Sequence, residues 1–314
     1  MSRTVGLVGA RGHTGRELIR LLAGRPDMAL SFASSRAMAG EAVSGLAPEA
    51  PKGLVFEALG PEDTAARGAD AVILALPNGA AGEYANAIIA ARPETVIVDL
   101  SADHRFDEGW AYGLPELQGR ERLTGVRRIA NPGCYATAGQ LAIHPLRDRL
   151  AGPAHVFGVS GHSGAGTMPS RKNDPEALKD NLMPYALSGH IHEREMARHL
   201  GAGVRFSPHV AEFFRGLTAT VQMELSSPVS AQELRGLYED AYGAEPLVQV
   251  MDGIPEIRDG AEINGAVVGG FALSEDGRRV VMVSALDNLL KGAAVQAVQN
   301  LALGLGLDEF EGLV

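Results

Sequence analysis

The sequence predicts a two-domain α/β protein, in which a domain with a doubly wound parallel sheet is followed by an α+β domain with a mixed or antiparallel sheet. In the first third of the chain, short and continuously apolar strands alternate with helical segments, which is typical of parallel strands covered on both faces. A glycine-rich loop follows the first of these strands. Beyond the middle of the chain, apolar and polar residues alternate within the strands, which indicates a sheet with one exposed face.

The composition limits the classes of function. Of the 314 residues, 46% are hydrophobic, which is enough for a sizeable core, and the net charge is −10 without a lysine or arginine block. We therefore expect no nucleic-acid partner. No apolar run approaches the roughly 20 residues that span a bilayer, and the chain enters its first strand without an apolar leader. A single cysteine excludes intramolecular disulfides, so we expect a cytoplasmic protein with no membrane segment.

The first strand, residues 4–8, leads into a loop with glycines three residues apart and then into a helical segment over residues 16–23. In a Rossmann-type domain the first glycine makes the tight turn, the second lets backbone amides approach a diphosphate, and the third lets the helix pack closely on its strand. An ordinary strand-to-helix turn is the alternative. The context favours a dinucleotide site, with contacts from Gly9, Arg11, Gly12, His13, Thr14 and Gly15.

The second strand, residues 29–33, ends in Ser34-Ser35-Arg36. Enzymes that use NAD usually place a carboxylate here, about 20 residues beyond the glycines, to bind the ribose 2′-hydroxyl. Two hydroxyls and a guanidinium suit a 2′-phosphate instead, whereas the alternative is an exposed polar loop. The sequence therefore favours NADP over NAD, with Ser34, Ser35 and Arg36 as contacts.

Two further apolar strands, residues 71–76 and 96–100, are each followed by polar residues. Ligands of open α/β sheets bind at the carboxyl ends of the strands. We therefore expect Asn78 near the cofactor, and Ser101 and Arg105 near the substrate. The alternative for Arg105 is a local ion pair with Asp103.

The only cysteine, Cys134, follows a Pro-Gly pair at the predicted start of a helix. Amide hydrogens and the positive end of the helix dipole favour the thiolate, which is the nucleophilic form. The alternative is an inert buried side chain, as for most single cysteines. Its position, with histidines downstream, favours a catalytic nucleophile.

The second domain is predicted over residues 134–286, and the first over residues 1–133 and 287–314. The last helical segment, residues 288–303, has an apolar face suited to return to the nucleotide domain. Because a sheet with one exposed face often packs against a second subunit, we expect a homodimer or homotetramer. The alternating strands are expected at 155–159, 220–225, 267–273 and 279–284.

Residues 160–167 are too rich in glycine and hydroxyl groups to continue a strand. Their backbone amides can surround an oxyanion, and Arg171 and Lys172 follow closely, although a flexible loop is the alternative. The members assigned to sites are Ser160 for the substrate, and Ser163 and Gly164 for the cofactor.

A His-x-His-x-x-Glu pattern spans His190, His192 and Glu195. Histidines two residues apart rarely ligate one metal from a strand or a helix, so we predict no metal site. In a helix that begins near His192, Glu195 lies on the same face and can orient the imidazole as the base that a thiol nucleophile needs. A capped surface helix is the alternative. Arg215, before a strand, is a candidate anion contact.

A nicotinamide cofactor, a thiolate and a histidine base together predict chemistry through an acyl-enzyme. A thioester keeps its carbonyl carbon electrophilic, so that carbon can accept a hydride. The thioester can form from an aldehyde, or from an activated acid whose leaving group the thiolate displaces. Phosphate is the leaving group that the glycine-rich loop and the basic residues suit.

Five stretches of the chain carry specific motifs: residues 9–15, 99–105, 112–116, 131–137 and 287–292. Through these motifs the chain resembles the N-acetyl-gamma-glutamyl-phosphate reductase family over nearly its whole length. The resemblance implies NADPH-dependent reduction of an N-acylated glutamyl phosphate to its semialdehyde in arginine biosynthesis. It also implies a thioester on Cys134, His192 as acid/base, His190 as a substrate contact, Asn288 beside the nicotinamide, and anion binding by Arg105 and Arg215, with Asn131 in the substrate site.

Three positions depart from the family pattern: Thr167 replaces an arginine, and Arg194 and Glu212 replace prolines. They leave open whether the acyl group is acetyl, another small acyl group or a carrier protein, with Arg171 or Lys172 in place of the missing guanidinium. The sequence also leaves open a dehydrogenase that acts on aspartyl phosphate, and an NADP-sensing protein without turnover.

Overall fold

The computed structural model describes residues 2–314. The chain forms two compact units, one that ends at Pro132 and resumes at Ala293, and one that spans Gly133–Gly292. The chain thus returns to the first unit at Ala293 rather than at the predicted residue 287. The reason is that Asp287 pairs with Arg215, a residue of the second unit, and remains there.

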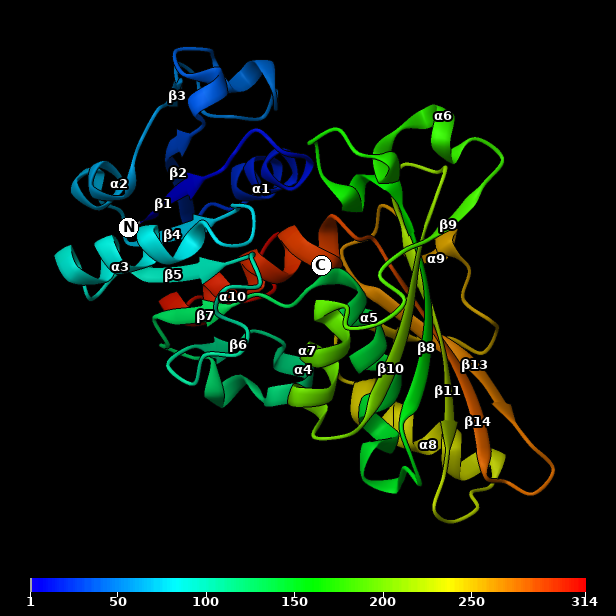
Figure 1. The fold of residues 1–314 in the computed structure, drawn as a ribbon. Coiled ribbons are helices and arrows are strands. Elements are labelled where there is room, and N and C mark those ends of the chain that lie inside the picture. Colours follow the sequence, from blue (N-terminus) through cyan, green and yellow to red (C-terminus); the bar gives the residue numbers. More distant parts are fainter. Residues whose placement is uncertain (1) are drawn as a thin grey trace. The chain divides into compact units, whose positions relative to one another are not determined.

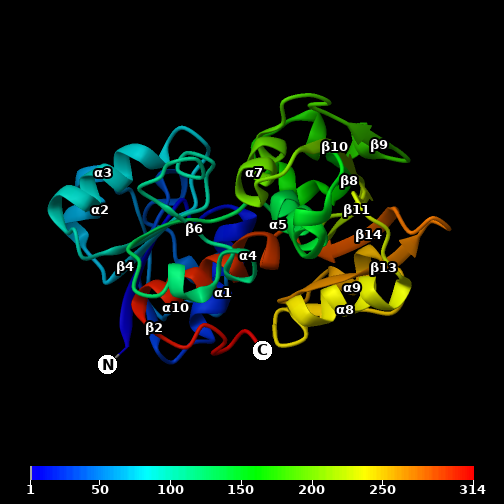
Figure 2. The same ribbon diagram turned by 90° about the horizontal axis from the view of Figure 1, so that it is seen from below.

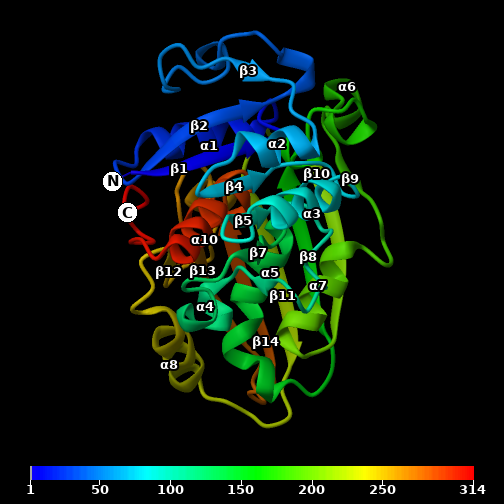
Figure 3. The ribbon, with the colours of Figure 1, turned by 90° about the vertical axis from the view of Figure 1, so that its left-hand side faces the viewer.

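Within the described part of the first unit, seven strands form one parallel sheet. The strand order is β3-β2-β1-β4-β5-β7-β6, so the winding direction reverses between β1 and β4 (Figure 3). Such a reversal is where ligands bind in open α/β sheets. The strands are β1 (Arg3–Val8), β2 (Met28–Ser34), β3 (Phe56–Glu57), β4 (Ala71–Leu74), β5 (Val96–Asp99), β6 (Ala111–Tyr112) and β7 (Arg128–Ala130).

Helices cover both faces of this sheet, as the continuously apolar strands predicted. Helix α1 (His13–Ala23) packs on α10 (Val295–Leu305), and α2 (Pro61–Arg67) packs on α3 (Ala81–Ala91) on the other side (Figure 2). The face of α1 that carries Leu18, Ile19, Leu21 and Leu22 is buried. The prediction of a doubly wound parallel domain is confirmed. A short helix, α4 (Pro115–Gln118), follows β6.

The second unit, all of which the structure describes, holds a seven-stranded mixed sheet in the order β12-β13-β14-β11-β8-β10-β9. Strands β8 and β10 pair in parallel, as do β12 and β13, and the remaining neighbours are antiparallel. This confirms the predicted mixed sheet. The strands are β8 (Ala154–Gly161), β9 (Leu182–Pro184), β10 (Val204–Ala211), β11 (Leu217–Glu224), β12 (Val248–Val250), β13 (Ala266–Leu273) and β14 (Arg279–Leu286).

One face of the second sheet is covered by helices. Helix α5 (Cys134–Ile143) packs on β11 and β14, and α7 (Ile191–Leu200) packs on α5 and β10 (Figure 1). Residues of β8, β10 and β11 alternate between buried and exposed, so the other face of the sheet remains open within one chain. The remaining helices are α6 (Pro175–Leu178), α8 (Ala231–Tyr242) and α9 (Ile257–Gly260).

Two helix boundaries differ from the sequence prediction. Helix α1 begins at His13 rather than at residue 16, so the third glycine lies inside its first turn. The last helical segment begins with a π-helical turn, Leu290–Ala294, before α10. The Asp287 carboxylate accepts the backbone N–H of Leu289 and so caps this irregular start. No helix in the described residues is long and apolar enough to cross a bilayer.

Candidate active site

Two glycines of the segment that leads from β1 into α1 stand where no other residue fits. Gly9 adopts φ +84°, and a Cβ there would lie 2.2 Å from the Ala75 carbonyl oxygen. A Cβ on Gly15 would lie 2.0 Å from the Ala10 oxygen, so only glycine lets α1 start this close to its strand. Gly12, by contrast, faces open space at the start of α1. The helix N-terminus, with Thr14 in its first turn, is therefore accessible to an anionic cofactor.

The end of β2 presents hydroxyls rather than a carboxylate. Ser34 and Ser35 are both buried, and the Ser34 hydroxyl accepts a hydrogen bond from Leu59. The Ser35 hydroxyl has no hydrogen-bond partner among the residues that the structure describes. Arg36 is exposed at the start of the following turn. Glu57 on β3, which lies beside Ser34, pairs with Arg67, so its negative charge is balanced.

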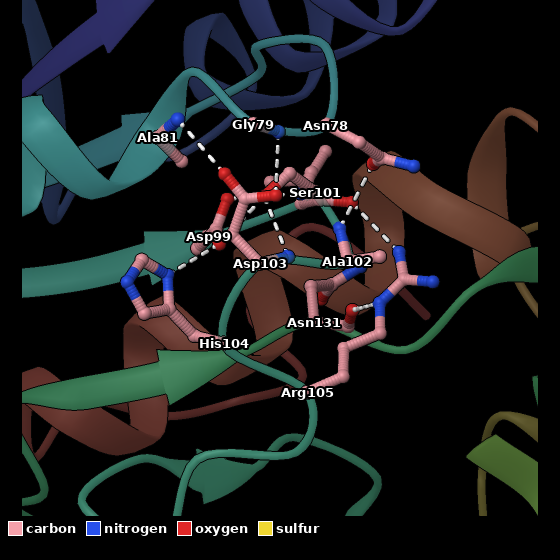
Figure 4. Close-up of polar contacts among 11 residues, drawn as sticks. Asn78, Gly79, Ala81, Asp99, Ser101, Ala102, Asp103, His104, Arg105 and Asn131 are labelled. Atoms are coloured by element: carbon pink, nitrogen blue, oxygen red, sulfur yellow. Dashed lines mark hydrogen bonds and ion pairs between the residues drawn. The ribbon is translucent and has the colours of Figure 1, made fainter. Parts of the chain in front are cut away.

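Hydrogen bonds in both directions join the loop after β4 to the loop after β5 (Figure 4). The Asn78 side-chain oxygen accepts the N–H of Ala102 at 3.0 Å. In return, the Asp103 carboxylate accepts the N–H groups of Gly79 and Ala81 at 2.6 and 3.1 Å. The Asp103 carboxylate therefore joins two loops at the carboxyl edge of the sheet. It serves this purpose instead of forming the local ion pair with Arg105 that the sequence left open.

Arg105 and Asn131 meet at the carboxyl ends of β5 and β7. Arg105 is buried and donates to the Asn131 carbonyl at 2.9 Å and to the Leu100 carbonyl at 2.8 Å. The Asn131 side chain accepts a 2.8 Å hydrogen bond from Asn300 and donates to the Ala293 carbonyl. These two hydrogen bonds fix the position of the guanidinium at the carboxyl ends of the strands.

Sequence reasoning missed Asp99 and His104, which lie in the same loop. The Asp99 carboxylate is fully buried and accepts hydrogen bonds from Ser101 and from the Nδ1 atom of His104 (Figure 4). A buried carboxylate at the end of an apolar strand, with polar partners two and five residues later, is the signal that would have found this pair.

In the second unit, Cys134 is the first residue of α5, as predicted. Its neighbour Gly133 donates its backbone N–H to the Glu195 carboxylate at 2.8 Å, so α7 is tied to the residue preceding the thiol. A Cβ on Gly292 would lie 2.7 Å from the Cβ of Cys134, which makes Gly292 a further residue that sequence reasoning missed. Glycine there leaves the space that Cys134 occupies.

His190 and His192 lie at the start of α7, on the helix that also carries Glu195. The Nδ1 atom of His190 accepts the N–H of His192 at 3.1 Å and caps the helix, and the two rings are 4.8 Å apart. Burial, assisted by the positive charge of Lys172, lowers the pKa of His190. Neutral His190 with Nδ1 as acceptor carries its proton on Nε2, so it can donate a hydrogen bond to a ligand.

Tyr185 lies beside His190 and Lys172. Its ring lies 5.7 Å from that of His190, and the Lys172 ammonium stands 4.7 Å from its centroid. Burial and then the charge of Cys134 raise the pKa of Tyr185, which indicates that the thiol is near. Of the two cations that the sequence offered in place of Thr167, Lys172 is therefore the one that lies beside His190.

The predicted oxyanion loop follows β8 as a 3₁₀ turn, His162–Ala165. The Ser163 hydroxyl accepts a hydrogen bond from the Asn288 side chain at 2.8 Å, and Asn288 accepts the N–H of Gly216. A Cβ on Gly164 would lie 3.1 Å from the Ser160 hydroxyl oxygen, so the loop is tightly packed on itself. The three predicted residues of this loop, Ser160, Ser163 and Gly164, therefore lie together, with Asn288 beside them.

Arg215 forms an ion pair with a carboxylate of its own unit. Its Nε atom lies 2.7 Å from the fully buried Asp287 carboxylate. The charge of Arg215 is therefore balanced within the protein. Among the described residues, no group of three or more His, Cys, Asp or Glu side chains is arranged to hold a metal ion.

Comparisons with known proteins agree over both units. The NAD binding domain of semialdehyde dehydrogenases matches residues 4–125, and their dimerisation domain matches residues 134–288. N-acetyl-gamma-glutamyl-phosphate reductase of Stenotrophomonas maltophilia is 55% identical over 99% of this chain and 98% of its own length. The Xylella fastidiosa protein of that name is 53% identical over 99% of this chain and 94% of its own length.

Solved structures show the same fold at low sequence identity. Aspartate semialdehyde dehydrogenase II of Vibrio cholerae superposes with a TM-score of 0.78 at 17% identity, covering 98% of this chain and 99% of that one. The Candida albicans aspartate semialdehyde dehydrogenase, solved with NADP, superposes with a TM-score of 0.72 at 16% identity. This match covers 97% of this chain and 98% of that one. With its cysteine, its paired histidines and its sequence identity to the reductases, this chain belongs to the N-acetyl-gamma-glutamyl-phosphate reductase family of semialdehyde dehydrogenases.

Proposed function

We propose that this protein catalyses the NADPH-dependent reduction of N-acetyl-γ-glutamyl phosphate to N-acetylglutamate 5-semialdehyde, with release of phosphate, in arginine biosynthesis. The observation that supports it most is the hydrogen bond from Gly133 to Glu195, because it brings the start of the Cys134 helix to the helix that carries both histidines. The reductase relatives favour this substrate over aspartyl phosphate and over a non-catalytic sensor.

Cys134 is the proposed nucleophile. The N-terminus of α5 favours the thiolate, which attacks the acyl carbon and forms the C–S bond as the C–O bond to phosphate breaks. The phosphate leaves with the electron pair of the broken bond. The nearby ammonium of Lys172 and the neutral Nε2–H of His190 are suited to hold the acyl phosphate, and Arg105 is proposed as its further anion contact.

NADPH, when bound, supplies the hydride that reduces the thioester carbon. We assign its diphosphate to the loop from Gly9 to Gly15, including Arg11 and His13, and its 2′-phosphate to Ser34, Ser35 and Arg36. The accessible N-terminus of α1 and the buried Ser35 hydroxyl at the end of β2 fit this cofactor. The remaining cofactor contacts assigned are Asn78, Ser163, Gly164 and Asn288.

His192 is the proposed acid/base. Protonated His192 donates its proton to the thioester carbonyl oxygen as the hydride adds to the carbon. It recovers this proton when the C–S bond breaks, which forms the aldehyde and releases Cys134 as thiolate. Glu195 is proposed as the carboxylate that positions both His192 and Cys134. It lies on the same helix as His192, and it accepts the N–H of Gly133, the residue before Cys134. Ser160, Asn131 and Arg215 are proposed as further substrate contacts.

We further propose that the protein is a cytoplasmic homodimer or homotetramer whose subunits associate through the open face of the second sheet. Phe157 on β8 is 43% exposed there and lies against His209 of β10 with 4.4 Å between ring centroids. The matching family domain over residues 134–288 is described as a dimerisation domain. An exposed aromatic on an open sheet suits burial against a second copy.

Phosphate-dependent reduction of NADP with N-acetylglutamate semialdehyde tests the proposed reaction. We expect turnover that requires phosphate, that exceeds the rate with aspartate semialdehyde, and that is lost in Cys134→Ser while NADPH binding is retained. Equal turnover in the absence of phosphate would instead identify a hydrolytic aldehyde dehydrogenase.

A further inference from the structure

The Asp99 carboxylate is the centre of a buried hydrogen-bond cluster at the carboxyl end of β5. It is fully buried and accepts the Ser101 N–H at 2.9 Å, the Ser101 hydroxyl at 2.8 Å and the Nδ1 atom of His104 at 2.7 Å. A carboxylate removed from water is costly unless its lone pairs are satisfied. The protein keeps this one at the edge of the sheet where ligands bind, and satisfies it with residues of a single turn.

His104 is held on two sides. Its Nδ1 atom bonds to Asp99, and its ring stacks on Trp110 with 3.9 Å between centroids and an interplanar angle of 16°. Trp110 in turn packs against the hydrophobic core of the first unit, which includes Leu74 and Ile97. The imidazole is therefore a fixed link between the core and the turn, rather than a mobile surface group.

The turn that this link fixes connects to the neighbouring strand loops. The Ser101 hydroxyl, while it donates to Asp99, accepts the N–H of Asp103 at 3.1 Å. Asp103 holds the loop after β4 through its two backbone hydrogen bonds (Figure 4). Arg105, which ends the turn, reaches back to the Leu100 and Asn131 carbonyls. The Ser101 hydroxyl is buried and both donates and accepts a hydrogen bond within the turn, so it is suited to hold the turn in place.

We propose that Asp99 and His104 are a positioning pair that sets the 100–105 turn, and with it Arg105, for binding the phosphoryl group of the substrate. The pair acts through Ser101 and the backbone of the turn and does not itself touch the substrate. This inference rests on the proposed function, in which Arg105 contacts an anion. The ligand is a phosphate monoanion or dianion, whether free or carried on an acyl group.

Two substitutions at residue 104 separate the hydrogen bond from the stack. The side-chain amide nitrogen of asparagine occupies nearly the position of Nδ1, so His104→Asn keeps the donor to Asp99 but loses the stacked ring. His104→Phe keeps a stacked ring on Trp110 but has no donor, which leaves the buried carboxylate short of a partner. The hydrogen bond, not the ring, is expected to matter for anion binding.

Trp110 is the only tryptophan in the chain, so its fluorescence reports on this turn without turnover. Titration with inorganic phosphate is expected to give a saturable change in the wild-type protein. His104→Phe should weaken phosphate binding and raise KM for the acyl phosphate roughly tenfold, as expected for loss of a hydrogen bond to a charged group, with much smaller changes in kcat and NADPH affinity. His104→Asn should recover most of the phosphate affinity.

The proposal is overturned if wild-type fluorescence does not respond to phosphate, if His104→Phe binds phosphate as wild type does, or if His104→Asn loses as much affinity as His104→Phe. Retained NADPH binding shows that a variant is folded. If His104→Phe does not fold, Ser101→Ala takes its place, because it removes the hydroxyl that links Asp99 to Asp103. We expect Ser101→Ala to weaken phosphate binding in the same way. Unchanged phosphate binding in that variant overturns the proposal too. Failure of the proposed function shows separately, as absence of acyl-phosphate reduction by the wild-type enzyme.

Discussion

The backbone N–H of Gly133 donates a 2.8 Å hydrogen bond to the carboxylate of Glu195, 62 residues further along the chain. One end of this bond adjoins Cys134, and the other belongs to the helix that bears His192. A single buried carboxylate thus determines the position of the proposed nucleophile relative to the proposed base. Its charge and its hydrogen-bonding capacity can be separated by substitution.

Glu195→Gln keeps an oxygen acceptor for Gly133 and removes only the charge, whereas Glu195→Ala removes both. We expect Glu195→Ala to lower the free energy of unfolding by about 1–3 kcal/mol, because it leaves a buried N–H unsatisfied, and Glu195→Gln to lower it much less. Both variants should lose turnover. Urea unfolding and steady-state kinetics measure these effects, and equal stabilities for the two variants would contradict the assigned role of the hydrogen bond.

Gly292→Ala is expected to displace the thiol. The added Cβ would lie 2.7 Å from the Cβ of Cys134, so one of the two residues must shift, and a small misplacement of a nucleophile is costly to its reaction. We expect turnover to fall more than about tenfold while NADPH affinity is retained. Gly236→Ala in α8 is the matched control, since nothing lies within 4 Å of a Cβ added there. Similar rates in both variants would show that Cys134 tolerates the crowding.

Lys172→Gln is expected to shift the pH profile. Burial and then the Lys172 charge lower the pKa of His190, so the neutral ring persists below the usual range of histidine. Removing the positive charge makes protonation easier and raises this pKa. Protonation of Nδ1 breaks the cap to His192, so the acid limb of kcat/KM should move to higher pH. An unchanged acid limb, or one that moves to lower pH, would exclude this coupling.

Arg36→Ala is expected to change cofactor preference. If the guanidinium binds the 2′-phosphate, its loss should raise Kd for NADPH by about tenfold or more and leave Kd for NADH nearly unchanged. Fluorescence titration with each cofactor measures the ratio. A proportional loss for both cofactors would place Arg36 elsewhere on the dinucleotide.

The parallel sheet was predictable because its buried strands are continuous apolar runs, which have few other interpretations. The residues of the glycine loop and of the cysteine helix were predictable because their motifs are local. The partners of Asp287 and Glu195 were not, since each lies more than sixty residues away and contributes no periodic signal. The same holds for Gly292, whose role depends on Cys134 and not on a turn of its own.

Asp99 and His104 show a different limit to prediction from sequence. Both were visible within a recognised motif, but a sequence does not distinguish a buried carboxylate from a solvated one. Only the fold places Asp99 inside the sheet edge and Trp110 against His104. The Asp103–Arg105 ion pair was equally plausible from sequence, yet in the structure Asp103 accepts hydrogen bonds from the backbone amides of the adjacent loop.

The central claim is an acyl-enzyme on Cys134, and a single-turnover measurement without phosphate tests it most directly. The enzyme is mixed with N-acetylglutamate semialdehyde and NADP, the NADPH formed is followed by absorbance, and the quenched protein is digested and analysed by mass spectrometry. We predict a burst of about one NADPH per subunit and an N-acetylglutamyl adduct on the peptide that contains Cys134. NADPH formation without a burst, and without an adduct on that peptide, would contradict the account.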